Sequence, residues 1–217
     1  MNRRQRQRGA MTTLSILMLA CAAHAQLSAD SPGIKSNREM RSDRERVGTN
    51  FEEMVRRLED PQAEVRLEAV KNLAESNDPR APQYLMEAVG DSDPRVAAVA
   101  VDALGRIGAK DASTFLAQRL FLASSSPGLR QRILVALGRI HDPAAARPVL
   151  DFTQSESDPK IRGTAIRVIG EIGDDSTLPA LRTFAEQEKD PQIKALIQEA
   201  EAKIEARQPH SENSGAP

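Results

Sequence analysis

Apolar residues recur along the chain in a pattern that repeats about every 32 residues. Five equivalent segments each open with an apolar residue, at spacings of 31, 33, 32 and 32: Val65, Val96, Leu129, Ile161 and Ile193. In the three middle segments, the fourth, fifth, eighth and eleventh residues after this opening residue are also apolar. That spacing places them on one face of an α-helix. A period of this length predicts a stacked array, in which each unit buries its apolar face against its neighbours.

These helices have a recognisable start. Asp93-Pro94 precedes the helix of the second segment. The aspartate can accept hydrogen bonds from the first helical turn, and proline suits the first helical position. The same type of pair recurs as Ser126-Pro127, Asp158-Pro159 and Asp190-Pro191, whereas the first segment has Gln62-Ala63.

Glycine recurs inside the helices, nine residues after the opening residue, as Gly105, Gly138 and Gly170. A glycine within a helix costs about 0.5–1 kcal/mol relative to alanine. Its recurrence therefore predicts the close approach of a neighbouring helix at this point. The alternative is that the glycines mark fraying helix ends.

A second, more variable element lies between these helices, over residues 78–89, 111–120, 142–152 and 174–184. Each begins with aspartate and carries one leucine anchor, namely Leu85, Leu116, Leu150 and Leu181. In the first unit, Thr49 and Glu52 fit the capping-box pattern. We therefore expect an all-α chain of about five antiparallel helix pairs. In the last unit Gln198, Glu199 and Glu201 replace apolar or neutral residues, as expected of a terminal unit with a polar outer face.

The motif Asp-Pro-x-Val/Ile, followed ten residues later by Ala-Leu-Gly-x-Ile, resembles HEAT repeats of the short bacterial type, also called phycobilisome-lyase HEAT-like repeats. The resemblance covers residues 48–206 and implies an α-α superhelix, a HEAT-like solenoid. Since most members of this family are protein-binding scaffolds, it implies a non-enzymatic scaffold or adaptor that binds a protein or peptide along its concave face. A few relatives are bilin lyases, so an enzyme or enzyme subunit acting on a bound chromophore or metal is the alternative. One branch is an iron-dependent hydroxylase with repeated His-Glu pairs, but this sequence contains no His-Glu dipeptide.

The N-terminus has the features of an export signal. Four arginines precede an apolar run over residues 11–23, which ends in the small-residue site Ala23-His24-Ala25. This order predicts a signal peptide over residues 1–25, cleaved before Gln26. Residues 17–21 also loosely resemble a bacterial lipobox, with lipidation at Cys21, and an uncleaved anchor is a third alternative. All three place the protein outside the cytoplasm, as a periplasmic or secreted protein or one anchored by lipid to the cell envelope.

The remaining chain divides into three parts. Residues 26–47 read as a flexible tether, 48–206 as the repeat array and 207–217 as a disordered tail. Because Cys21 is the only cysteine, we expect no disulfide in the mature protein.

Composition narrows the range of partners. Removing the four N-terminal arginines leaves 26 basic residues (30 − 4) against 31 acidic residues, a net charge near −5. Aromatic residues make up 3% of the sequence, with no tryptophan. We therefore do not expect nucleic-acid binding, or membrane contact other than through an N-terminal lipid.

Candidate chemistry is sparse. His24 lies in the N-terminal segment and His210 in the tail, and we interpret His141 as a turn or helix-cap residue. The serines at 124–126 connect two helices with no plausible base nearby, and paired carboxylates such as those at 174–175 suit a helix N-terminus. The sequence shows no phosphate loop, zinc spacing or catalytic triad. We predict no catalytic or metal site and no cofactor.

The solvent-facing positions of the long helices offer a candidate binding surface. The resemblance implies that the second helix of each pair lines the concave face, with the third, sixth and tenth residues after the opening residue as its floor. Arginine beside exposed apolar surface is typical of a protein-binding hot spot. The alternative is a solvated face with local ion pairs. The candidate residues are Val99, Asp102, Arg106, Arg132, Val135, Arg139 and Arg167.

A second basic row directly follows the opening apolar residues: Arg66, Arg130, Arg162 and Lys194. We expect these side chains to pair with acidic groups of adjacent turns and to hold the stack together.

Overall fold

The computed structural model describes residues 50–207. The predicted signal peptide, Cys21, the tether, Thr49 of the capping box and the tail from residue 208 lie outside these residues. Within them all regular secondary structure is helical, with ten α-helices packed in neighbouring pairs. The all-α architecture and the five helix pairs are therefore confirmed.

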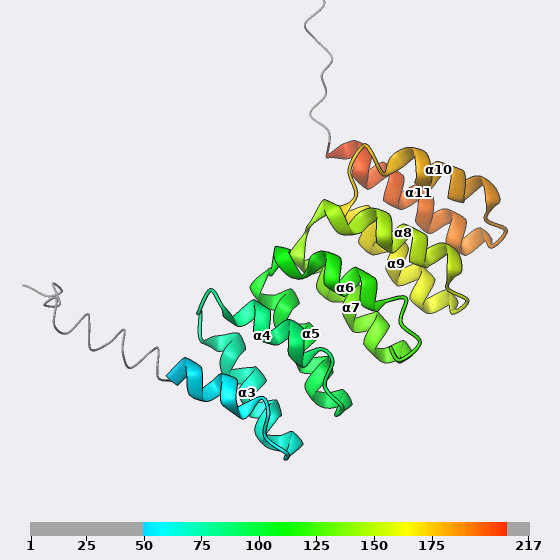
Figure 1. The fold of residues 1–217 in the computed structure, drawn as a ribbon. Helices are drawn as coiled ribbons and strands as arrows, with labels where there is room; N and C mark the ends of the chain where they lie inside the picture. The colour runs from blue at the N-terminus through cyan, green and yellow to red at the C-terminus, as the bar shows by residue number, and fades with distance from the viewer. Residues whose placement is uncertain (1–49, 208–217) are drawn as a thin grey trace, which may run out of the picture. The chain divides into compact units, whose positions relative to one another are not determined.

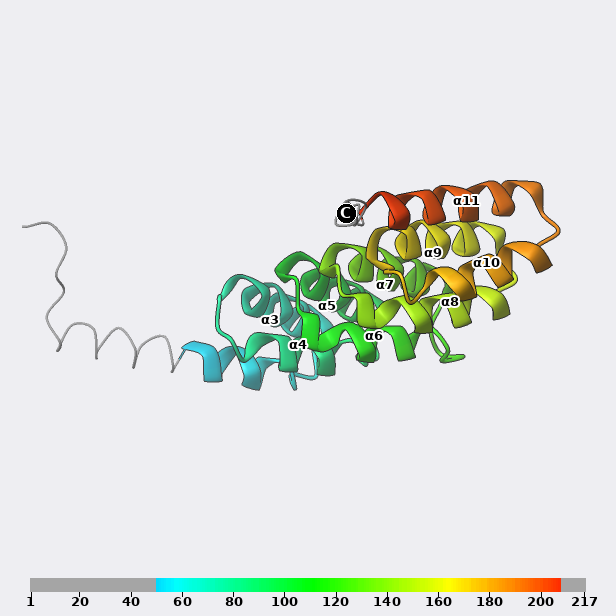
Figure 2. The ribbon, with the colours of Figure 1, turned by 90° about the horizontal axis from the view of Figure 1, so that it is seen from above.

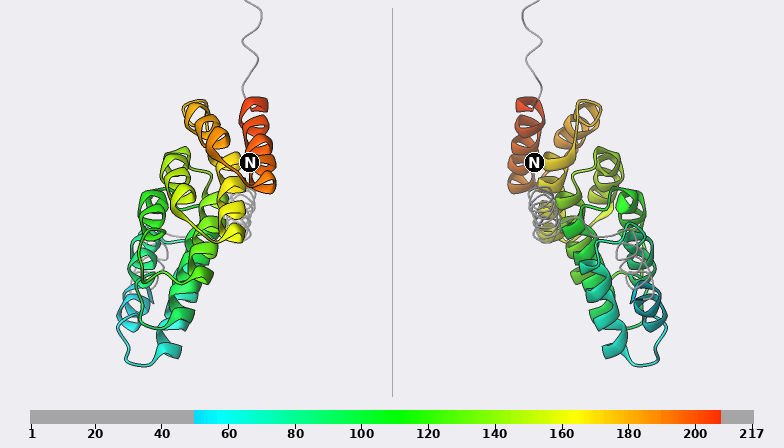
Figure 3. Two further views of the ribbon diagram at one scale, coloured as in Figure 1. Left: turned by 90° about the vertical axis from the view of Figure 1, so that its right-hand side faces the viewer. Right: turned by 90° about the vertical axis from the view of Figure 1, so that its left-hand side faces the viewer.

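The helices fall into two layers (Figures 1 and 2). The long-helix layer consists of α3 (Ala63–Glu75), α5 (Pro94–Ile107), α7 (Pro127–Ile140), α9 (Pro159–Ile172) and α11 (Pro191–Ala206), each in contact with the next. The short-helix layer consists of the helix at 50–57, α4 (Ala81–Ala88), α6 (Ser113–Arg119), α8 (Ala146–Ser155) and α10 (Leu178–Gln187). The side views of Figure 3 show one layer beside the other. The core lies between the layers and between consecutive units.

The predicted helix starts are present. Asp93 accepts a hydrogen bond from the backbone N–H of Arg95 at 2.8 Å, and Ser126 accepts one from that of Leu129 at 3.2 Å. Asp158 and Asp190 cap α9 and α11 in the same way, and Gln62 makes no side-chain cap. The cap-plus-proline pairs therefore fix where four of the five long helices begin.

The short-layer helices begin later than predicted. Three of their aspartates cap a preceding turn rather than the helix. Asp78, Asp142 and Asp174 each accept a hydrogen bond from the backbone N–H two residues further on, at 2.9, 3.1 and 3.1 Å. Asp111 instead lies within the turn before α6. Before α6 and α8 that turn is a short 3₁₀ segment, at Lys110–Ala112 and Pro143–Ala145. The four leucine anchors are fully buried: Leu85, Leu116, Leu150 and Leu181.

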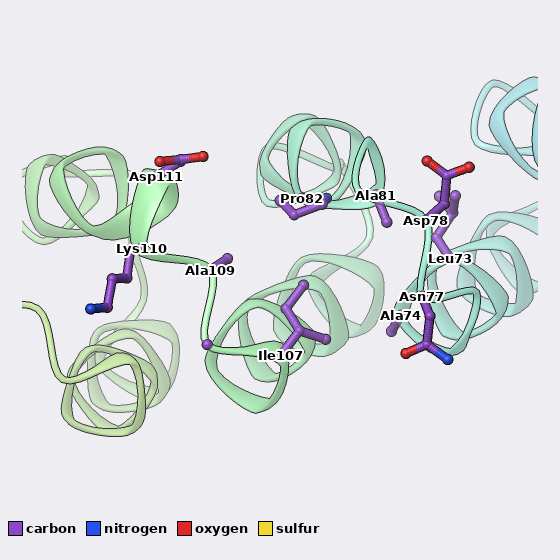
Figure 4. Close-up of a pocket in the computed structure, with 11 residues that line it drawn as sticks. Leu73, Ala74, Asn77, Asp78, Ala81, Pro82, Ile107, Ala109, Lys110 and Asp111 are labelled. Carbon is purple, nitrogen blue, oxygen red and sulfur yellow. The ribbon is translucent and has the colours of Figure 1, made fainter.

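Two apolar-face predictions were wrong in detail. Ile107 is 40% exposed, whereas its equivalents Ile140 and Ile172 are buried. Ile107 lies at an open pocket of about 370 Å³ between the ends of α3 and α5 and the turn that precedes α6 (Figure 4). Glu201 is half-buried rather than on a polar outer face, because the eighth position of each unit points into the core.

The recurrent glycines mark close helix contacts. A Cβ on Gly105 would lie 2.8 Å from the Cα of Ala136, and one on Gly170 would lie 3.0 Å from that of Ala200. Gly138 differs, because there the nearest atom is a side-chain oxygen of Glu171. Close approach, rather than helix fraying, therefore explains Gly105 and Gly170.

We predict that Gly105→Ala destabilises the protein by about 1–3 kcal/mol, because the backbone of α7 must move to admit the methyl group. Urea unfolding followed by circular dichroism measures this. Gly128→Ala is the matched control, since a Cβ there meets nothing within 4 Å and should be neutral or stabilise by up to about 1 kcal/mol. Equal unfolding midpoints for the two variants would contradict the close contact.

Glu201 yields a second prediction. Burial raises the pKa of Glu201, and its Oε1 has no hydrogen-bond partner among the described residues. A buried carboxyl group with a raised pKa does not destabilise the folded state below its ordinary pKa, where it is protonated. As the pH rises through the folded-state pKa, the group must ionise in its buried site, and the folded state loses stability. Glu201→Gln should therefore raise the thermal midpoint at pH 7 and leave it unchanged near pH 4. An equal gain at both pH values would show that the charge is not the cause.

Candidate protein-binding face

The outer surface of the long-helix layer carries the predicted candidate residues. Arg106, Arg132, Val135, Arg139 and Arg167 are exposed. Val99 and Asp102 are half-buried, and Val99 packs against the core rather than standing free. The exposed part of the candidate surface therefore lies on α5, α7 and α9.

One candidate pair is neutralised within the face. Arg132 on α7 binds Asp102 on α5 through an ion pair of 2.5 Å, with the two side chains 52% and 41% exposed. An exposed pair of this kind contributes little stability. It does, however, hold Arg132 against α5, so this guanidinium already has a carboxylate partner.

A groove between α7 and α9 brings three of the candidates together. It has a volume of about 630 Å³ and includes Val135, Arg139 and Arg167 in its lining. Val99, Asp102, Arg106 and Arg132 lie outside it. The other lining residues are Gln131, Gly138, His141, Thr164, Val168 and Glu171.

Sequence reasoning missed these other residues as site residues. Thr164 and Glu171 belong to the same exposed rows as the candidates, so a signal for them was present. His141 is exposed and ends α7 in a left-handed conformation with φ of 53°, as predicted for a turn or cap residue. Its place in the groove depends on where the next helix lies, which the pattern of residues does not show.

Glycine shapes the floor of this groove. Because Gly138 has no side chain, the carboxylate of Glu171 lies over α7 at this point, with its Oε2 2.8 Å from the position that a Cβ would take. Val135 is 40% exposed and Val168 lies on the α9 side. The groove thus combines an apolar floor with charged walls.

The charged groups of the groove differ in their partners. Arg167 donates a long hydrogen bond of 3.4 Å to the hydroxyl of Thr164. It also lies near Glu199 of α11, whose pKa is lowered chiefly by a hydrogen bond from Lys203 and to a smaller degree by Arg167. Within residues 50–207, Arg106 and Arg139 form no ion pair.

The described residues contain no group of three or more His, Cys, Asp and Glu side chains that could hold a metal ion. The serines of the 124–126 loop have structural contacts: Ser125 donates to the carbonyl of Arg119 at 2.7 Å, and Ser126 caps α7. Among residues 50–207, no helix is both long and apolar enough to cross a membrane.

Comparison with known families shows to which family this helical array belongs. Two overlapping stretches, residues 51–121 and 118–201, match the family of HEAT repeats. The chain belongs to the HEAT-repeat family. The predicted resemblance is confirmed at the level of the repeat, and its phycobilisome-lyase subtype stays a prediction.

Solved structures similar to this HEAT-repeat protein include an engineered protein, with 19% identity, a TM-score of 0.49, and 72% of this chain and 79% of that chain covered. A designed armadillo repeat protein has 16% identity and a TM-score of 0.47, with 81% and 96% covered. A second designed armadillo repeat protein, solved in complex with the peptide (KR)4, has 17% identity and a TM-score of 0.49, with 81% and 95% covered. No curated protein sequence matches the chain.

The second basic row connects consecutive HEAT units. Arg66 on α3 binds Asp91 through two hydrogen bonds of 2.7 Å, and these side chains are only 13% and 10% exposed. Asp91 also accepts the backbone N–H of Asp93, the cap of α5. Each such pair, which we call a rung, therefore joins one long helix to the turn that starts the next. The other rungs are Arg130–Glu156 and Arg162–Glu188.

The row is interrupted at two places. Lys194 forms no ion pair within residues 50–207, in contrast to the prediction, because no further unit follows α11 in the described chain. In the second unit Ala97 replaces the arginine, and Ser124 stands where the other turns have an acid. Both partners are thus missing together, so no unpaired charge is left at this junction.

The rung at Asp91 predicts a pH-dependent stability. Hydrogen bonds from Arg66 hold the pKa of Asp91 below its ordinary value of 3.8. The stability linked to a lowered carboxyl pKa is present above the ordinary value and is lost as the pH falls through the folded-state value. Asp91→Asn should therefore lower the thermal midpoint at pH 7, and the difference from the wild type should shrink below pH 3.8.

Glu87→Gln is the control for this variant, because Glu87 is an exposed residue of α4 with no ion pair among the described residues. It should leave the midpoint unchanged at both pH values. A deficit of Asp91→Asn that is as large below pH 3 as at pH 7 would exclude the charge of the rung as its cause.

Proposed function

We propose that this HEAT-repeat protein is a non-enzymatic scaffold or adaptor that binds a protein or peptide along the exposed face of α5, α7 and α9. The observation that supports this most directly is the groove between α7 and α9, where exposed Val135 lies beside Arg139 and Arg167. Apolar surface next to arginine is the usual composition of an interface hot spot.

The stacked architecture also supports the proposal of a protein-binding scaffold. A stacked array exposes a long continuous surface made of equivalent positions from successive helices, and repeat proteins use such surfaces for binding. Here consecutive long helices contact each other from α3 to α11, and their caps and rungs hold them in register. The groove therefore belongs to a continuous face built by several units, and a face held in register has less conformational entropy to lose on binding.

We further propose that the protein acts outside the cytoplasm, in the cell envelope. This part rests on the sequence of residues 1–25, with cleavage before Gln26 and lipidation at Cys21 as the two principal forms of processing. Intact-mass measurement of the protein purified from membranes separates them, since a diacylated cysteine and an unmodified Gln26 start differ in both length and mass. A mature protein that retains residues 1–20 would contradict both.

The binding proposal predicts the effect of reversing charge on the face. Arg106→Glu, Arg139→Glu and Arg167→Glu combined should abolish the capture of the partner from an envelope lysate, while helical content stays unchanged. The matched control reverses three arginines of the short-helix layer, Arg56, Arg147 and Arg182, which leaves the groove intact.

Capture that survives the first triple reversal, or is lost equally in the control, would show that the face between α5 and α9 is not the binding site. The purified native protein should also carry no stoichiometric chromophore or metal, as measured by absorbance and elemental analysis. Detection of either would favour the lyase-type enzyme instead.

A further inference from the structure

The charges on the binding face are not evenly balanced from one unit to the next. The tenth position after the opening residue forms a row across the five long helices, with one residue from each: Glu75, Arg106, Arg139, Glu171 and Lys203. Neighbouring packed helices lie about 8–10 Å apart. Arg106 on α5 and Arg139 on α7 are therefore two adjacent positive charges, in the second and third places of the row.

Three other cations of the face lie close to acidic groups. Arg132 is paired with Asp102, and Lys203 is paired with Glu199 at 2.9 Å. Arg167 contacts Thr164 and lies in the field of Glu199. Within the described residues, Arg106 and Arg139 form no ion pair, although the next members of the row, Glu75 and Glu171, lie one helix away on either side. Two adjacent guanidinium groups that form no ion pair favour an anion that reaches both.

The residues around Arg139 strengthen its attraction for an anion on the α7 side of the groove and weaken it on the α9 side. Exposed Val135 and the groove floor at Gly138 present low-dielectric surface beside Arg139, and such walls focus the field of a charge. Glu171 lies over Gly138 at the α9 side of the same groove. Its carboxylate repels an anion, so the positive region is confined to the α5 and α7 side.

We propose that this surface selects an extended acidic peptide segment, with carboxylates at alternate positions that bind Arg106 and Arg139. Alternate residues of an extended chain point to the same side and lie about 7 Å apart. Long arginine and glutamate side chains span the remaining distance between neighbouring helices. This inference rests on the proposed function, since it names the chemistry of the partner that the same face binds.

Fluorescence anisotropy with two labelled peptides tests the inference on the full-length protein. One probe has eight residues of alternating glutamate and serine, and the other has lysine in place of glutamate. We expect the acidic probe to bind with an affinity that falls as salt is added, and the lysine probe not to bind. Arg106→Gln and Arg139→Gln should each weaken the binding of the acidic probe about tenfold, as the loss of one charge-assisted hydrogen bond predicts.

Two further variants make the test specific. Arg147→Gln removes an equal charge from the short-helix layer, where this arginine is paired with Asp151, so its effect should stay within about twofold. Glu171→Gln should tighten binding of the acidic probe, because it removes the repelling carboxylate. Circular dichroism shows whether each variant keeps its helical content.

The inference is overturned if the acidic probe does not bind, if the lysine probe binds equally well, or if Arg147→Gln weakens binding as much as Arg139→Gln. These outcomes differ from failure of the proposed function. The triple reversal could abolish capture of the natural partner while the acidic probe does not bind to the wild-type protein. That result would support the binding face and reject its specificity for acidic peptides.

Discussion

The structure depends on the burial of each unit's apolar face against the next unit. One helix pair has too little interior to stabilise itself, and stacking supplies the missing contacts. Leu104, Leu137 and Ile169, at the same position of three successive units, are all fully buried in this way. The caps, the rungs and the close helix contacts all serve to keep the long helices in the register that this burial requires.

Much of this arrangement could be predicted because it repeats. The Asp-Pro and Ser-Pro pairs identify helix starts from local chemistry alone, and Gly105 and Gly170 indicate contacts with a neighbouring helix. Prediction failed where a residue departs from its equivalents. Glu201 is charged but occupies the eighth position, which the repeat pattern itself assigns to the core, so its partial burial was foreseeable. Ile107 is 40% exposed although its equivalents in the next two units are buried, and the pattern within a single repeat does not show this.

The candidate site, too, could be predicted only in part. The exposed rows were predictable from helical spacing, and most of their members are on the surface. Which of them gather in one groove was not predictable, since Val135 and Arg167 meet across two helices 32 residues apart in sequence. The partner of Arg132 is Asp102, 30 residues away, and this pairing separates Arg132 from Arg139, which the spacing treats as equivalent. Pairing across units thus determines which arginines remain available.

Gly138 connects the packing of the array with the surface that it presents. The missing side chain creates the hollow beside Arg139, and it also lets Glu171 lie across α7. A larger residue at this position would fill the hollow and displace that carboxylate at the same time. Because the atom in the way is the end of a flexible side chain and not backbone, that carboxylate can swing aside while α9 keeps its place, so this one position can change both the shape and the charge of the groove at little cost to the stack.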